Sequence, residues 1–135
     1  MIHAFTILLA MLIGFSSPAM AMDAVIEQLR LQVPSAHREL WLQAEALTWQ
    51  PWLEQQDGFE QRSLYWDPMR EEGVVLIEWA SRAQWKGIPE AEVLRVQALF
   101  EAEVNQILQR SKDAAPLFPL LAEGELQQQL LTSVR

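Results

Sequence analysis

Glu78 is the polar residue whose position most invites chemistry, because it interrupts the apolar run from Val74 to Trp79. A carboxylate inside a buried strand must be paired or solvated. If the odd-numbered residues of that run face helices, Glu78 shares its side of a sheet with Gln28 and Arg30. Two interpretations follow. We favour an ion pair with Arg30, buried in a dimer interface, over a general base beside a tryptophan-lined pocket.

Six tryptophans in 135 residues suggest an aromatic ligand site. Trp66 and Trp79 are the better candidates, because each ends a predicted strand, although plain packing is favoured even for these two. Trp41, Trp49 and Trp52 recur at helical spacing and are expected in the core or at a dimer interface. The candidate cavity-lining residues are therefore Gln28, Arg30, Trp66, Glu78 and Trp79.

The composition excludes several kinds of site. The chain has no Cys, which removes disulfide scaffolds, thiolate zinc sites and cysteine nucleophiles. Its net charge of −8, without a basic run, argues against nucleic-acid binding. His37, at a predicted helix start, has no second His near it and is interpreted as a solvated residue. We expect no metal and no cofactor, and we assign no catalytic residue.

The hydrophobic pattern predicts the elements that would position these side chains. Alternation predicts a strand from Val25 to Val33, and Pro34-Ser35 ends it and starts a helix that Pro51 limits or kinks. Phe59 to Trp66 is predicted to be a second strand. The β-branched run Val74 to Ile77 is predicted to be a buried third strand.

The second half of the chain continues this order. Ser81 and Gln84 form a capping box, and Pro89 starts a second long helix. Leu117 to Leu126 is expected to be a fourth strand, with its edge marked by Pro119. The order β-α-β-β-α-β predicts an α+β fold, a ferredoxin-like plait whose four-stranded antiparallel sheet carries both helices on one face. The other face would expose large apolar side chains, so a partner sheet is expected there.

The first 22 residues carry no Lys, Arg, Asp or Glu. The apolar run Ala4 to Phe15 is followed by a proline and by Ala19-Met20-Ala21, which is the order of a secretory signal. We therefore predict a signal peptide over 1–21, cleaved after Ala21, and one exported domain over 22–135. Because the segment before the apolar run lacks Lys and Arg, a cytoplasmic chain that starts at Met20 or Met22 stays open as the alternative.

Several motifs resemble those of the antibiotic biosynthesis monooxygenase superfamily. They are Val25-Ile26-Glu27, Asp57-Gly58-Phe59 and Val75 to Ser81 with Trp85-Lys86. More narrowly, the chain resembles a small uncharacterised family of photosynthetic bacteria over about residues 24–126. The resemblance implies a homodimer in which two sheets pack as a dimeric α/β barrel, with a small-molecule cavity between each sheet and its helices.

Active members of that superfamily include haem-degrading oxygenases and cofactor-free oxygenases that act on aromatic polyketides. The haem degraders use a first-strand Asn, a Trp at the end of strand three and a His in the following helix. Trp79 matches the Trp, the amide position falls at best on Gln28, and the helix after Trp79 has no His. Without an imidazole ligand for iron, haem degradation is not expected.

Three functions stay open. The first is an exported dimer that binds a small aromatic or hydrophobic molecule. The second is a cofactor-free oxygenase or isomerase that acts on an aromatic or quinone-like substrate beside Glu78 and Trp79. The third is a purely structural or partner-binding dimer whose pocket is filled by its own side chains. We expect no nucleic-acid partner and no stable membrane span after signal cleavage.

Overall fold

The computed structural model describes residues 24–133, and the predicted signal peptide with its cleavage point lies outside the described residues. The elements follow one another as β1 (Val25–Gln32), η1 (Ser35–His37, a 3-10 helix), α2 (Arg38–Leu47), α3 (Trp49–Leu53), β2 (Phe59–Asp67), β3 (Glu72–Trp79), α4 (Arg82–Lys86), α5 (Glu90–Ile107) and β4 (Leu120–Leu126).

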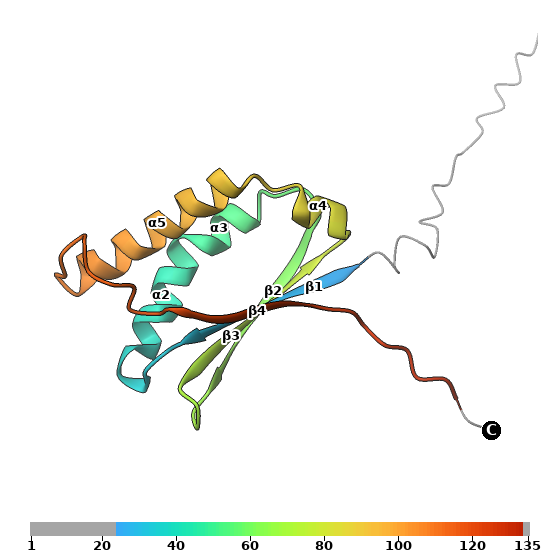
Figure 1. The fold of residues 1–135 in the computed structure, drawn as a ribbon, viewed down its shortest axis with the longest axis horizontal. Coiled ribbons are helices and arrows are strands. Elements are labelled where there is room, and N and C mark those ends of the chain that lie inside the picture. The colour runs from blue at the N-terminus through green and yellow to red at the C-terminus, as the bar shows by residue number, and fades with distance from the viewer. Residues whose placement is uncertain (1–23, 134–135) are drawn as a thin grey trace, which may run out of the picture.

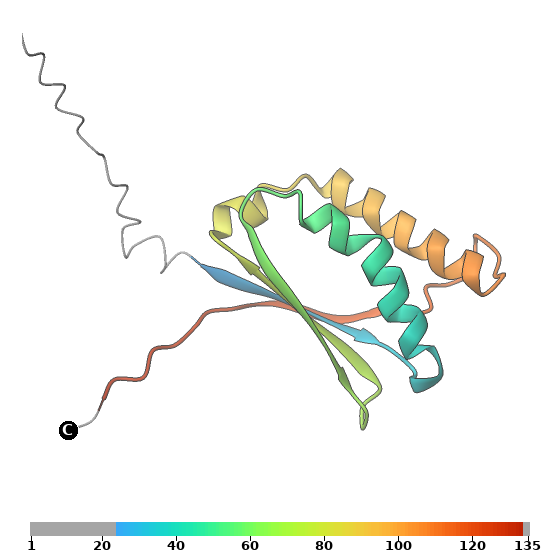
Figure 2. The ribbon, with the colours of Figure 1, turned by 180° about the vertical axis from the view of Figure 1, so that it is seen from behind.

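The four strands form one antiparallel sheet in the order β2-β3-β1-β4. Helices α2, α3 and α5 lie on one face of this sheet, and no described helix lies on the other (Figures 1 and 2). The predicted ferredoxin-like α+β fold is thus confirmed. None of the helices in residues 24–133 is long and apolar enough to cross a membrane.

Every strand differs from its predicted bounds at one end or both, by one to three residues, and the starts of β3 and β4 have local reasons. β3 begins at Glu72 rather than Val74, because Glu72 pairs with Asp67 on one side and with Gln32 on the other. β4 begins at Leu120 rather than Leu117, directly after Pro119, which has no N–H to contribute to a strand ladder. Both differences are small and leave the order of the elements unchanged.

The helix-facing side of β3 forms the floor of the core. Val75, Ile77 and Trp79 are buried there and alternate with half-buried residues that point to the opposite face. Gly73 continues the same row, and the fully buried Trp41 of α2 lies against it. A Cβ at Gly73 would lie 2.7 Å from two atoms of the Trp41 ring, so the missing side chain makes room for the indole.

The first helix is broken at Thr48, as Pro51 predicts. Pro51 has no N–H to donate to the carbonyl of Leu47, four residues earlier. Thr48 leaves the helical conformation, with φ −122° and ψ −71°, and its hydroxyl donates to the Ala44 carbonyl at 2.7 Å. The break gives α3 a direction of its own over the sheet (Figure 2).

The predicted helix starts in the second half are also confirmed. Ser81 is the N-cap of α4 and its hydroxyl accepts a hydrogen bond from the Gln84 N–H at 3.1 Å. Pro89 immediately precedes α5, in the extended conformation of a cap. Phe100 and Val104 of α5 then reach the core, where Phe100 meets Phe118 edge-on.

Candidate functional site

A cavity of about 910 Å³ lies between the helix-facing side of the sheet and the helices α3 and α5. Its walls are largely apolar and include four tryptophans, which are Trp49, Trp52, Trp79 and Trp85. Trp49 and Trp52 pack edge-on, with ring centroids 5.7 Å apart. The volume lies within the range of about 300–1,000 Å³ that is usual for small-molecule sites.

Glu27 places a carboxylate against this apolar wall. It pairs with Ile77 across the β1–β3 ladder and therefore points to the helix side of the sheet. The Trp79 indole N–H donates to Glu27 Oε1 at 3.2 Å. Burial raises the pKa of Glu27, while the indoles of Trp79 and Trp85 and the charge of Lys86 act in the opposite direction. Glu27 is therefore a carboxyl group whose proton affinity is increased by its site, as general acids and bases require.

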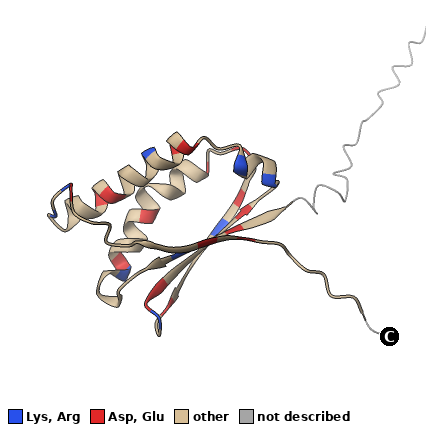
Figure 3. Ribbon diagram, viewed as in Figure 1, with Lys and Arg blue, Asp and Glu red and all other residues tan. Residues whose placement is uncertain are grey.

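More charges surround Glu27 at this end of the cavity. Glu125 pairs directly with Glu27 across the β1–β4 ladder, and Glu123 pairs with Leu29, so both lie on the cavity side. The negative charge of Glu123 also raises the pKa of Glu27. Arg82 Nε of α4 contacts Glu125 Oε2 of β4 at 3.1 Å. The basic end of α4 thus lies beside acidic residues of the sheet (Figure 3).

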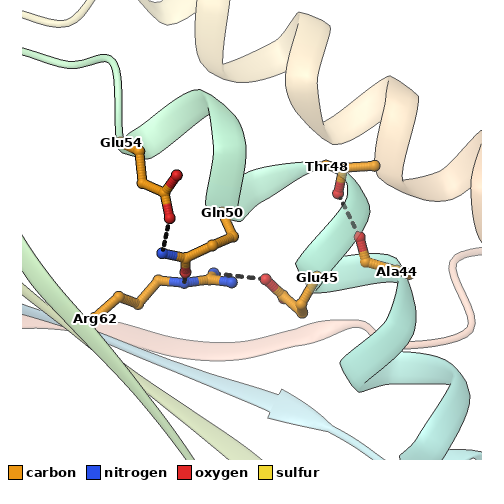
Figure 4. Close-up of polar contacts among 6 residues, drawn as sticks. All are labelled: Ala44, Glu45, Thr48, Gln50, Glu54 and Arg62. Carbon is orange, nitrogen blue, oxygen red and sulfur yellow. Dashed lines mark hydrogen bonds and ion pairs between the residues drawn. The ribbon is translucent and has the colours of Figure 1, made fainter.

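A buried ion pair forms a second polar point of the cavity wall. Arg62 Nη1 donates to Glu45 Oε2 at 2.6 Å, and the two side chains are 3% and 5% exposed. Arg62 Nε donates to Gln50 Oε1 at 2.8 Å, and Gln50 Nε2 donates to Glu54 at 2.9 Å (Figure 4). Burial raises the pKa of Glu45, and the charge and hydrogen bond of Arg62 oppose that shift. Three elements, β2, α2 and α3, thus hold one guanidinium in place.

The predicted cavity-lining residues do not lie together. Trp79 lines the cavity, whereas Gln28, Arg30 and Glu78 lie on the outer face of the sheet, because their ladder partners are the outward-facing residues of the neighbouring strands. Trp66 lies on the helix side but is not among the residues that line this cavity, and its N–H donates to the Val33 carbonyl at 3.0 Å.

The predicted ion pair between Arg30 and Glu78 does not form within the chain. Arg30 Nη1 instead contacts Glu72 Oε2 at 3.1 Å, and Glu78 accepts a hydrogen bond from Gln61. The β1–β3 register explains the difference: Arg30 pairs with Val74, which places it next to the start of β3, whereas Glu78 pairs with Ile26 near the strand's end.

Sequence reasoning missed Glu27, although a signal for it was present. The alternation that places Val25, Leu29 and Leu31 toward the helices also places Glu27 there. Glu27 is the only acidic residue of that series, which could have marked it as a site residue. For the same reason the first-strand position beside Trp79 is Glu27 and not Gln28. Trp49 and Trp52 pack against the core, as predicted, and they also form part of the cavity wall.

Among residues 24–133, no group of three or more His, Asp or Glu side chains could hold a metal ion. Among the polar groups that line the cavity, two have defined partners in its wall: the Glu27 carboxyl beside the Trp79 indole, and the Arg62 guanidinium in its ion pair with Glu45. This arrangement can accept or supply a proton at one point and donate hydrogen bonds at the other.

The chain matches no family model and no curated protein by sequence. Solved structures with a similar fold include the cofactor-independent oxygenase SnoaB of Streptomyces nogalater, in a mutant form, at 17% identity, 81% and 96% coverage of the two chains and a TM-score of 0.51. The ActVA-Orf6 monooxygenase of Streptomyces coelicolor, in complex with nanaomycin D, is similar at 12% identity, 85% and 96% coverage and a TM-score of 0.53. Rv0793 of Mycobacterium tuberculosis is similar at 18% identity, 82% and 99% coverage and a TM-score of 0.50.

These similarities extend over most of each chain, and at such identities they concern the fold. The narrower resemblance to a family of photosynthetic bacteria stays a prediction. The chain therefore shares the ferredoxin-like fold of these solved structures, two of which are named as a cofactor-independent oxygenase and a monooxygenase.

Proposed function

We propose that the chain binds a small aromatic or hydrophobic molecule in the cavity between the sheet and the helices. The observation that carries the proposal is the cavity itself, about 910 Å³ in volume and lined by four tryptophans. Indole rings offer large, rigid apolar surfaces to an aromatic ligand at a low cost in conformational entropy. Two structures of similar fold are named as oxygenases or monooxygenases, and one of them holds nanaomycin D, which supports the same use of this fold.

Equilibrium dialysis against 2-ethylnaphthalene tests this proposal, because the probe is aromatic, uncharged and free of hydrogen-bonding groups. Leu29→Trp places an indole into the cavity and should abolish binding. Gln28→Trp, one residue earlier on the same strand, adds the same side chain to the outer face and should bind as the unchanged chain does. Equal binding by both variants would place the probe elsewhere, and no binding by the unchanged chain would contradict the proposal.

A second candidate function is proton abstraction from the bound molecule, as in a cofactor-free oxygenase or isomerase. The observation that favours it is the position of Glu27, within hydrogen-bond reach of Trp79 in the cavity wall and with a raised pKa. The base is therefore Glu27 and not Glu78. Anthrone, whose ring methylene loses a proton to a base and whose anion reacts with oxygen, is a suitable probe. Oxygen uptake that the Glu27→Gln variant lacks and the Glu78→Gln variant retains would support this function, and equal uptake would contradict it.

We also propose that two copies of the chain pack through the outer face of the sheet. Ile26, Val74 and Leu76 lie on that face, and the neighbouring Tyr65 is 57% exposed. No described element covers these side chains, and an exposed apolar patch rimmed by polar residues favours association. Sedimentation should show a dimer that Leu76→Glu dissociates. A monomeric unchanged chain would contradict the proposal.

We also propose that residues 1–21 direct export of the domain. Its support is the uncharged apolar leader that ends in Ala19-Met20-Ala21. Mass spectrometry of the exported fraction should find Met22 as the first residue. A chain that begins at Met22 and is found only in the cytoplasm would contradict export and favour initiation at Met22.

A further inference from the structure

Arg62 and Glu27 lie in one row across the sheet. Ile77 of β3 pairs with Glu27 of β1 on one side and with Arg62 of β2 on the other. Paired residues point to the same face, so all three reach the cavity, which each of them lines. Strands lie about 4.8 Å apart, so the backbones at Glu27 and Arg62 are separated by about 10 Å. A bound aromatic molecule can therefore lie over Ile77 with a polar group toward either end.

The side chain of Arg62 is fixed before any ligand binds. Glu45 accepts a hydrogen bond from Arg62 Nη1, and Gln50 accepts one from Arg62 Nε. Glu54 in turn accepts a hydrogen bond from the Gln50 amide. On an unbroken helix, residues five apart point about 140° away from each other. The break at Thr48 allows Glu45 of α2 and Gln50 of α3 to meet the same guanidinium (Figure 4).

The outer nitrogen of Arg62 remains available. No described residue accepts a hydrogen bond from Nη2, whereas Nε and Nη1 both donate to protein acceptors. Nη2 is not among the fully buried polar atoms of residues 24–133 that lack a partner, so it is reached from the cavity that Arg62 lines, and a ligand oxygen there would accept its hydrogen bond. The fixed orientation means that little additional conformational entropy is lost when that hydrogen bond forms.

The charge of the site determines which oxygen fits. Arg62 is already neutralised by Glu45, so it offers hydrogen-bond donors without an uncompensated positive charge. The rest of the cavity wall carries Lys86 as its other basic residue, and its acidic residues besides Glu45 are Glu27, Glu90, Glu101, Glu123 and Glu125. A carboxylate ligand would be repelled by these acids, whereas an uncharged carbonyl oxygen would not.

We propose that Arg62, held by Glu45 and Gln50, is the specificity-determining residue of the cavity and donates through Nη2 to an uncharged acceptor oxygen of the bound molecule. The inference rests on the proposed small-molecule binding in this cavity and names the chemistry that the site selects. Arg62 thereby becomes a binding residue, and the ion pair with Glu45 positions it.

Three probes of similar size separate the possibilities. 2-Acetylnaphthalene carries an uncharged carbonyl, 2-ethylnaphthalene lacks the oxygen, and 2-naphthoate carries a carboxylate. By equilibrium dialysis, the unchanged chain should bind the ketone about tenfold more tightly than the hydrocarbon, as expected for a hydrogen bond from a charged donor, and the carboxylate more weakly than the ketone.

Removal of Arg62 alone would leave Glu45 buried without a partner, so both residues are replaced. The Glu45→Leu/Arg62→Met variant keeps the site apolar and should bind the two uncharged probes with equal affinity. The matched control is Arg30→Met/Glu72→Leu, which removes an ion pair from the outer face of the same sheet and should keep the preference for the ketone. The single variant Arg62→Lys retains a charge beside Glu45 but loses the guanidinium fork, and it should also lose most of the preference.

The outcomes distinguish this inference from the function on which it rests. If no probe binds the unchanged chain, both are overturned. If the hydrocarbon binds but the ketone binds no more tightly, or if the preference survives in Glu45→Leu/Arg62→Met, ligand binding stands and the role of Arg62 is overturned. Tighter binding of 2-naphthoate than of the ketone would overturn the selection of an uncharged oxygen.

Discussion

Replacement of Gly73 by Ala tests how tightly the core beside the cavity is packed. A Cβ at this position would lie 2.7 Å from both Cζ2 and Cη2 of Trp41 and 3.0 Å from a methyl group of Val33. Carbon atoms in favourable contact lie about 3.5–4.0 Å apart, so the ring would have to retreat by about 1 Å. Trp41 is 0% exposed, so its ring cannot move aside into solvent.

The expected loss of stability follows from that overlap. Overpacking of a rigid core costs about 1–3 kcal/mol, and a fully buried indole that meets a strand backbone belongs at the upper end. The smaller entropy of the unfolded alanine chain returns about 0.5–1 kcal/mol. The net loss is therefore about 2 kcal/mol, which lowers the Tm of a domain of this size by about 8 °C.

Differential scanning calorimetry of three variants checks this reasoning. Gly124→Ala is the matched control, because no heavy atom lies within 4 Å of its added methyl group, and its Tm should change little. In a Trp41→Phe background, where the ring is shorter, Gly73→Ala should cost much less than it does alone. If Gly73→Ala melts at the same temperature as Gly124→Ala, the indole does not restrict this site and the reasoning is refuted.

Two further predictions concern the charged groups of the cavity. Arg62→Met should destabilise the fold by about 3–5 kcal/mol in urea denaturation, because it leaves the buried carboxylate of Glu45 without its counter-ion. Glu39→Gln removes an ion pair whose side chains are 44% and 83% exposed and should cost less than about 1 kcal/mol, and similar losses in the two variants would contradict this. Glu27→Gln should raise the Tm at about pH 8. Burial raises the pKa of Glu27, so its ionised form opposes folding at that pH. Below the ordinary pKa of 4.5 the carboxyl is protonated in both the folded and the unfolded state, and the gain in Tm should disappear. Thermal melts across this pH range measure the trend, and a gain that grows on acidification would contradict the assigned direction.

The order of the elements could be predicted because it depends on short-range patterns. Alternation in β1, Pro51 in the first helix, the N-cap at Ser81 and the proline before α5 each act within a few residues, and each is present in the structure. The topology then follows from the handedness of the connections.

The site depended on information that local patterns do not contain. The alternation of side chains along β1 places Glu27 toward the helices, but its contact with Trp79 depends on the register between β1 and β3. The same register separates Arg30 from Glu78. Arg62 was not singled out because its partners Glu45 and Gln50 come from helices whose relative direction is set by the break at Thr48. Residues brought together by register and by helix direction are those that a single sequence identifies least well.

The row formed by Glu27, Ile77 and Arg62 has a consequence for how this cavity could change its ligand. The separation of the two polar groups is set by the spacing of three hydrogen-bonded strands, about 10 Å from first to last. Substitutions in the tryptophan wall alter the thickness and width of the molecule that fits, but they leave this separation unchanged. The sheet therefore fixes the length between the polar contacts of a ligand, while the helices determine its shape.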